Sequence, residues 1–108
     1  MANFDVTITD NSDAFKDALP EQIERALIAI GLAAESHAKE LCPVDTGRLR
    51  NSISHETDSD SVYIGTNVEY AAFVELGTSK SRARPYLRPA AENYTNEYRE
   101  LAERALKS

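Results

Sequence analysis

The sequence has one cysteine, no tryptophan and no long hydrophobic run. Because Cys42 has no partner in the chain, no internal disulfide is expected, which fits synthesis in a reducing cytoplasm. No stretch approaches the roughly 18 apolar residues of a membrane span. The N-terminus also lacks the basic segment and apolar run of a secretory signal. These absences predict a protein that is neither inserted in a membrane nor exported by a signal peptide.

Basic residues are also scarce, with 12 Lys and Arg against 18 Asp and Glu, a net charge of −6. Specific nucleic-acid binding needs a dense basic footprint, so we expect none. The acids gather in residues 1–45, which hold nine acids and three bases. The main basic group comprises Lys80, Arg82, Arg84 and Arg88. It is either solvated loop charge or a contact with an acidic partner, for which the acidic N-terminal half of a neighbouring copy is a candidate.

The sequence shows no pattern of residues for catalysis or metal binding. Ser36 and His37 are neighbours on a predicted helix, where they point about 100° apart and form no nucleophile–base pair. Cys42 and the two histidines, His37 and His55, lack metal-ligand spacing. No nucleophile elbow or phosphate loop occurs. We therefore expect no catalytic residue, no cofactor, no metal and no enzymatic activity.

The first half of the chain predicts a strand and a long helix. Apolar and polar residues alternate from Phe4 to Ile8, which indicates a half-buried strand, and the polar cluster 10–13 ends it. From Phe15 to Leu41 the apolar residues recur every three or four positions, as on one face of a helix. Pro20 is a candidate for the first turn of this helix, and Pro43 ends it.

The second half predicts a hairpin followed by shorter elements. Residues 48–57 and 62–66 read as two strands around a polar turn, and 69–76 as a short helix ended by Gly77. Residues 78–84 form a loop that we expect to become ordered only on assembly.

A second amphipathic helix, stepping from Leu87 to Ala105, closes the chain. The expected fold class is therefore α+β, with a long N-terminal helix and a C-terminal helix packed on a small antiparallel sheet. At 108 residues, the chain has room for one domain, spanning 1–108.

Three segments carry motifs that occur together in one known family. Residues 42–53 resemble P-x-D-T-G-x-L-x-x-S-I, residues 70–78 resemble Y-A-x-x-v-E-x-G-T, and residues 84–90 resemble R-P-[FY]-L-x-P-A. Their order and spacing over residues 20–106 are similar to those of the gene-product-ten-like minor tail, neck or tail-completion proteins of long-tailed phages and prophages.

The first motif predicts a turn made by Pro43, Asp45, Thr46 and Gly47. Its glycine would take a positive φ and lead the chain from helix into strand. Arg48 would then share one strand face with Arg50, opposite Leu49.

The third motif places a proline on each side of Tyr86 and Leu87. The two prolines would hold this segment extended and deny it a regular helix, leaving it free to dock on a neighbour or on its own core. The residues expected at a subunit or partner interface are Arg48, Arg50, Glu75, Gly77, Thr78, Lys80, Arg82, Arg84, Pro85, Tyr86, Leu87 and Arg88.

The resemblance implies a structural protein of the head–tail junction, made in the bacterial host cytoplasm and located in the virion. Its implied partners are further copies in a ring of about six, the connector or head-closure proteins, and the tail-terminator or tail-tube proteins. DNA would only pass through the lumen. Six copies at −6 each give roughly −36, and a lumen lined by part of this charge would repel DNA.

Two other classes of function compete with this interpretation. One is an acidic protein-binding module of the host or prophage, which neutralises a toxin or binds another single heterologous partner without self-assembly. The other is a small hydrolase, for which a convergent Ser/His/Asp pocket would be the sign.

Overall fold

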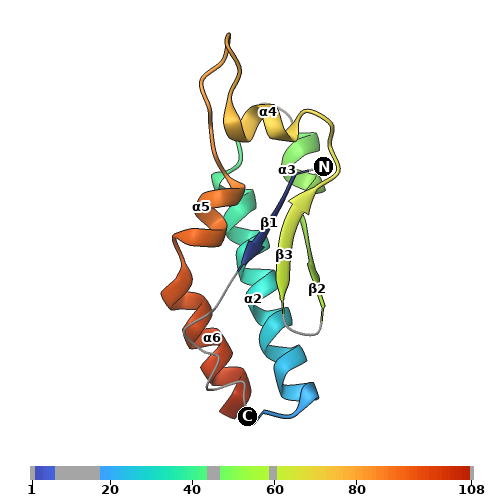
Figure 1. Ribbon diagram of the computed structural model, residues 1–108, viewed down its shortest axis with the longest axis vertical. Helices are drawn as coiled ribbons and strands as arrows, with labels where there is room; N and C mark the ends of the chain where they lie inside the picture. The colour runs from blue at the N-terminus through green and yellow to red at the C-terminus, as the bar shows by residue number, and fades with distance from the viewer. Residues whose placement is uncertain (1, 7–17, 44–46, 59–60, 108) are drawn as a thin grey trace.

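The computed structural model describes residues 2–6, 18–43, 47–58 and 61–107. The molecule is elongated, with extents of 50 × 20 × 19 Å (Figure 1). A long helix runs along it, with a small sheet on one side and the C-terminal helices on the other. The elements in order are β1 (Ala2–Val6), α2 (Pro20–Leu41), α3 (Gly47–Ser52), β2 (Ser54–Thr57), β3 (Val62–Thr66), α4 (Ala71–Leu76), α5 (Leu87–Glu92) and α6 (Thr95–Lys107).

The fold class is α+β, as predicted, and α2 begins at Pro20 and ends at Leu41, two residues before Pro43. Pro20 occupies the first turn, where its missing N–H is not needed. The side chain of Gln22 accepts a hydrogen bond from the Leu19 N–H at 2.9 Å. At the other end Cys42 is extended, with ψ 133°, because Pro43 disfavours helical geometry in the residue before it. The helix buries a stripe of mostly small residues: Ala26, Leu27, Ile30, Gly31, Ala34 and Ala38.

The sheet has three antiparallel strands in the order β1-β3-β2. The predicted hairpin is its β2–β3 pair, in which His55 lies opposite Ile64. Alternate residues of β3, namely Val62, Ile64 and Thr66, are buried. The predicted first strand is present as residues 2–6; its last two positions, the polar cluster and Phe15 lie outside the described residues.

The prediction of a strand beginning at Arg48 is wrong, because residues 47–52 form helix α3. Leu49 and Ile53 are both buried, and their separation of four residues is helical spacing. Arg48 and Arg50 therefore share no strand face. Gly47 has no positive φ and instead opens this helix.

The C-terminal region forms two helices, α5 and α6, where the sequence predicted one. The prediction that prolines hold residues 86–89 out of a helix is wrong as well. Pro89 stands in the first turn of α5, where no intrahelical donor is lost. Tyr86, with φ −137° and ψ −33°, is the N-cap.

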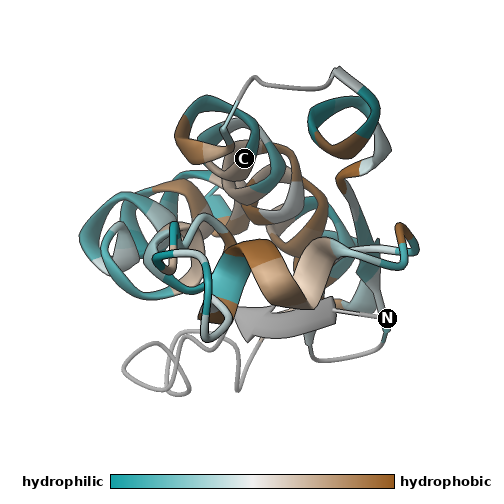
Figure 2. Cartoon of the chain, turned by 90° about the horizontal axis from the view of Figure 1, so that it is seen from above, coloured by the Kyte–Doolittle hydropathy of each residue, from teal (hydrophilic) through white to brown (hydrophobic). Residues whose placement is uncertain are grey.

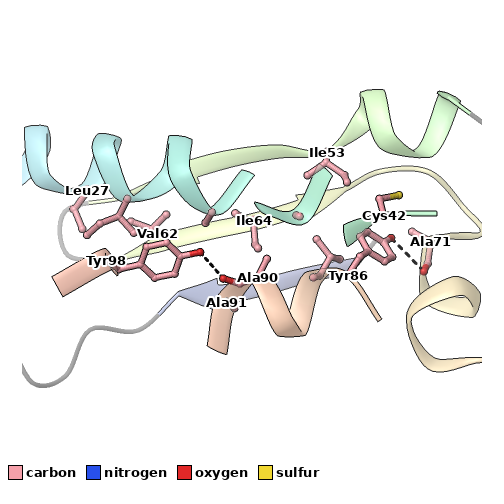
Figure 3. Close-up of a cluster of buried hydrophobic side chains, with 14 of the residues drawn as sticks. Leu27, Cys42, Ile53, Val62, Ile64, Ala71, Tyr86, Ala90, Ala91 and Tyr98 are labelled. Carbon is pink, nitrogen blue, oxygen red and sulfur yellow. Dashed lines mark hydrogen bonds between the residues drawn. The ribbon is translucent and has the colours of Figure 1, made fainter. Parts of the chain in front are cut away.

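Two tyrosines anchor the core between the sheet and the helices (Figure 3). Both Tyr86 and Tyr98 are fully buried. Each hydroxyl donates to a carbonyl, Tyr98 to Ala90 at 2.5 Å and Tyr86 to Ala71 at 3.4 Å. Burial raises the pKa of both phenols, so each keeps its proton and its donor role. Among the described helices, none is long and apolar enough to cross a membrane.

Candidate assembly surface

A buried carboxylate joins the second and third sequence motifs. Glu75, on α4, is 5% exposed. Its Oε1 accepts hydrogen bonds from the backbone N–H groups of Tyr86 at 3.0 Å and Leu87 at 2.8 Å, and its Oε2 accepts one from Arg88 at 3.2 Å. These donors belong to the start of α5, where N–H groups have no partner inside the helix. Glu75 thus supplies from another helix the cap that Tyr86 lacks.

The loop between α4 and α5 is held at both of its ends. Gly77, with φ 79° and ψ 173°, adopts a conformation that is essentially restricted to glycine, and a Cβ there would lie 2.7 Å from the Ala83 nitrogen. The Thr78 hydroxyl accepts hydrogen bonds from the N–H groups of Lys80 and Ser81. The Arg84 N–H donates to the Val74 carbonyl at 2.9 Å. These hydrogen bonds all lie within one chain, and the prediction that the loop becomes ordered only on assembly stays a prediction.

This loop projects from one end of the molecule, next to α4 (Figure 1). Phe73 and Leu76, three residues apart on α4, are 61% and 73% exposed. The loop's basic residues Lys80, Arg82 and Arg84 are exposed as well. Figure 2, viewed onto this end, shows the apolar colour of α4 next to the hydrophilic loop. We call these five residues the basic end.

The first motif connects the end of α2 to α3. Its Pro43 follows the helix and its Gly47 opens α3, whereas Asp45 and Thr46 lie outside the described residues. Cys42, directly after α2, is buried, and desolvation raises the pKa of its thiol. The thiol therefore stays protonated and serves as a small apolar contact.

Arg48 and Arg50, on α3, are exposed. The Arg48 guanidinium donates to both carboxylate oxygens of Glu69, at 3.2 and 3.1 Å, and lies 5.6 Å from the centre of the Tyr70 ring. The backbone and Arg48 hydrogen bonds of the Glu69 carboxylate lower its pKa. Arg48 thus already has partners in its own chain.

Two hydrogen-bonded groups lie outside the predicted site. On α2, Glu35 accepts from His55 Nδ1 at 2.9 Å and pairs with Lys39 at 3.2 Å. The His55 ring packs so closely on Gly31 that any side chain there would collide with it. In the sequence, Gly31, four positions before Glu35, indicates a close approach on this face of α2. The sequence does not show that His55, on β2, is the residue that approaches it.

A second group lies between α2 and α6. His37 Nε2 is 2.5 Å from Glu97, and its ring stacks on Tyr94 with centroids 3.6 Å apart. Glu40 approaches the other ring nitrogen at 3.8 Å. His37 and Glu97 also line a groove between the two helices, together with Ser36 and Glu100. The only sequence signal was a histidine at the edge of the helical stripe.

The structure divides the predicted interface residues into two sets. Glu75, Tyr86 and Leu87 point into the core, where they position the loop and α5 rather than face another molecule. The other residues are at least partly exposed: Arg48, Arg50, Gly77, Thr78, Lys80, Arg82, Arg84, Pro85 and Arg88. Whether these touch a partner stays a prediction.

The described residues contain no group of three or more His, Cys, Asp or Glu side chains that could hold a metal ion. The hydrolase alternative predicts a pocket that holds Ser, His and Asp. Ser36 and His37 both line the groove between α2 and α6, but the acidic residues that line it are glutamates. His37 is hydrogen-bonded to Glu97 and not to Ser36.

Two features of this architecture bear on the family. The second and third motifs meet at Glu75, and the first motif joins α2 to α3. A family model described as "Bacteriophage HK97-gp10, putative tail-component" matches residues 7–77. The chain belongs to this family. The matched range contains the first motif and the second as far as Gly77, while Thr78, the R-P-Y-L motif and α6 lie beyond it. No curated protein and no solved structure matches the chain significantly. Membership places this gp10-like protein in a family described as a phage tail component.

Proposed function

We propose that this tail component is a non-enzymatic subunit of the head–tail junction, in the neck or at the tail-completion position. It assembles into a ring of about six copies around the DNA channel. The observation that carries the proposal is the basic end, where Phe73 and Leu76 are 61% and 73% exposed beside a loop fixed by hydrogen bonds. Contiguous exposed apolar side chains rimmed by charge are typical of an interaction surface.

The conformation of the loop at the basic end supports a role in assembly. The glycine conformation at Gly77 and the Glu75 cap favour one geometry of the loop within a single chain. A preorganised loop loses less conformational entropy on binding than a mobile one. The connector or head-closure proteins on one side, and the tail-terminator or tail-tube proteins on the other, are the proposed neighbours of the ring.

The charge of the chain supports a passive role toward DNA. Six copies at −6 each carry roughly −36, and a lumen lined by part of this charge repels the phosphate backbone. The junction would then let DNA pass without retaining it. A basic inner wall in a structure of the assembled ring would contradict this.

Light scattering of the full-length protein across concentration, alone and with the connector particle of its phage, tests the proposal. We expect a discrete oligomer of about six copies, or a monomer that becomes one on the connector. A monomer in both settings would overturn the ring.

The net charge of −6 also favours a second candidate, an acidic module that binds one heterologous partner. This candidate requires a monomer at every concentration and a 1:1 complex with its partner. The same scattering experiment therefore separates the two.

A further inference from the structure

A surface complementary to the basic end lies in the other half of the molecule. The groove between α2 and α6 has Ala33 and Leu101 among its lining residues, together with Glu97 and Glu100. Glu40 lies near its upper end, next to His37. Arg104 lines the groove one helical turn beyond Glu100. The end of the groove next to His37 is therefore acidic. We call the whole groove the acidic groove.

Exposed apolar side chains also flank the acidic groove. Ile28 and Leu32, four residues apart on α2, are 41% and 56% exposed. Ser36, which lines the groove, is the next residue along the same helix face. An exposed apolar pair thus lies on α2 beside a residue that lines the groove and its carboxylates, as Phe73 and Leu76 lie beside the basic side chains of the basic end.

We propose that the basic end of one copy docks in the acidic groove of the next. The apolar pair of α4 would cover Ile28 and Leu32, while Lys80 and Arg82 would face Glu97 and Glu100. This inference rests on the proposed function and specifies the contact between subunits that builds the ring.

Charge complementarity favours a second copy of this chain as the occupant. Residues 78–88 contain four bases and no acid, although the whole chain carries −6. Two copies repel through most of their surfaces and attract where this segment meets carboxylates. Within one molecule the two surfaces cannot meet, because the basic end lies beyond α4 and the groove runs along α6 in the opposite half (Figure 1).

The contact is heterologous, since each copy uses one surface toward one neighbour and the other surface toward the second neighbour. Repetition of such a contact generates a closed ring when its rotation closes. Its charged part lies at the surface, so its strength falls as ionic strength rises.

Disulfide trapping under the conditions that assemble the ring tests the pairing directly. Arg82→Cys protein is mixed with Glu100→Cys protein and oxidised. Because Cys42 is buried, the introduced thiols are the reactive ones. We expect a covalent dimer in this mixture and at least tenfold less when Glu56→Cys, on the exposed side of β2, replaces Glu100→Cys. Equal cross-linking of the two mixtures would overturn the pairing.

Charge reversal gives a second, independent readout by light scattering. Arg82→Glu and Glu100→Arg are each expected to lower the assembled fraction at least tenfold, and mixing the two variants is expected to restore it. Glu56→Arg is the matched control and is expected to assemble normally. Because both target side chains are exposed, we expect each variant to fold normally. A thermal unfolding midpoint equal to that of wild type checks this.

The outcomes for the two proposals are distinct. Wild-type protein that stays monomeric, alone and with the connector, overturns the ring and this contact with it. A wild-type ring that tolerates both reversals overturns only the pairing of the basic end with the acidic groove.

Discussion

Glu75 and Leu87 are twelve positions apart, and a hydrogen bond of 2.8 Å joins the carboxylate of the first to the backbone N–H of the second. The same carboxylate also accepts from the N–H groups of Tyr86 and Arg88. One side chain therefore fixes both the end of the projecting loop and the start of α5. This explains in physical terms why a glutamate in the second motif accompanies an R-P-Y-L sequence in the third.

Replacing Glu75 with alanine is expected to destabilise the protein by roughly 2–4 kcal/mol, because buried N–H groups lose their acceptor. Glu75→Gln should fall between, since its amide oxygen can accept but its NH₂ group cannot. Urea unfolding followed by circular dichroism measures the change. Glu103→Ala, at an exposed position on α6, is the control and should leave the midpoint unchanged. Equal midpoints for Glu75→Ala and Glu103→Ala would contradict the role of the cap.

Gly77→Ala is expected to cost about 2 kcal/mol or more, from backbone strain at φ 79° and from the contact of the new Cβ with the Ala83 backbone. Gly47→Ala is a matched control, because among the described residues its Cβ would meet the Asn51 side chain alone, at an ordinary 3.6 Å, within a helix. That control should be neutral or slightly stabilising. Thermal unfolding of the two variants side by side measures the difference. A Gly77→Ala variant as stable as the control would show that the loop relaxes freely.

Sequence reasoning succeeded where the signal is local or strictly periodic. The apolar stripe and the two prolines located α2 because each acts within one helical turn. It failed at Leu49 and Ile53, which it assigned to a strand although their four-residue spacing also fits a helix. It failed again at Pro89, since a proline breaks a helix interior but fits its first turn, and only the position of the N-cap tells these apart.

The candidate site was predictable only in part, for a related reason. The basic residues of the loop are visible as a cluster in the sequence, and the structure leaves them exposed. The inward direction of Glu75 was not predictable, because its partners are backbone N–H groups that become available only when α5 is placed. The acidic groove joins α2 to α6 through His37 and Glu97, 60 positions apart, so no local pattern contains it.

Stability in acid is expected to depend on Glu35. Burial raises the pKa of this carboxyl, but the hydrogen bonds from His55 and Lys39 outweigh burial and bring the pKa below its usual 4.5. A lowered folded-state pKa stabilises the fold above the unfolded value, and this contribution is lost as the pH falls through the folded value. Glu35→Gln should therefore unfold with less dependence on pH below about 4.5. Urea midpoints between pH 3 and pH 6 test this, with Glu103→Gln as control. Parallel pH profiles for Glu35→Gln and wild type would contradict it.

The order of the loop can be measured by hydrogen exchange on the isolated subunit. The Arg84 N–H donates to the Val74 carbonyl and the Gly77 N–H donates to the Phe73 carbonyl, at 2.9 and 2.8 Å. Both amides should exchange more slowly than an unstructured chain even without partners, because each must open a hydrogen bond first. Glu75→Ala should remove the protection at Arg84, since the cap holds the returning end of the loop. Exchange of Arg84 at the unstructured rate in the free wild-type subunit, with protection appearing only in the ring, would show instead that assembly orders the loop.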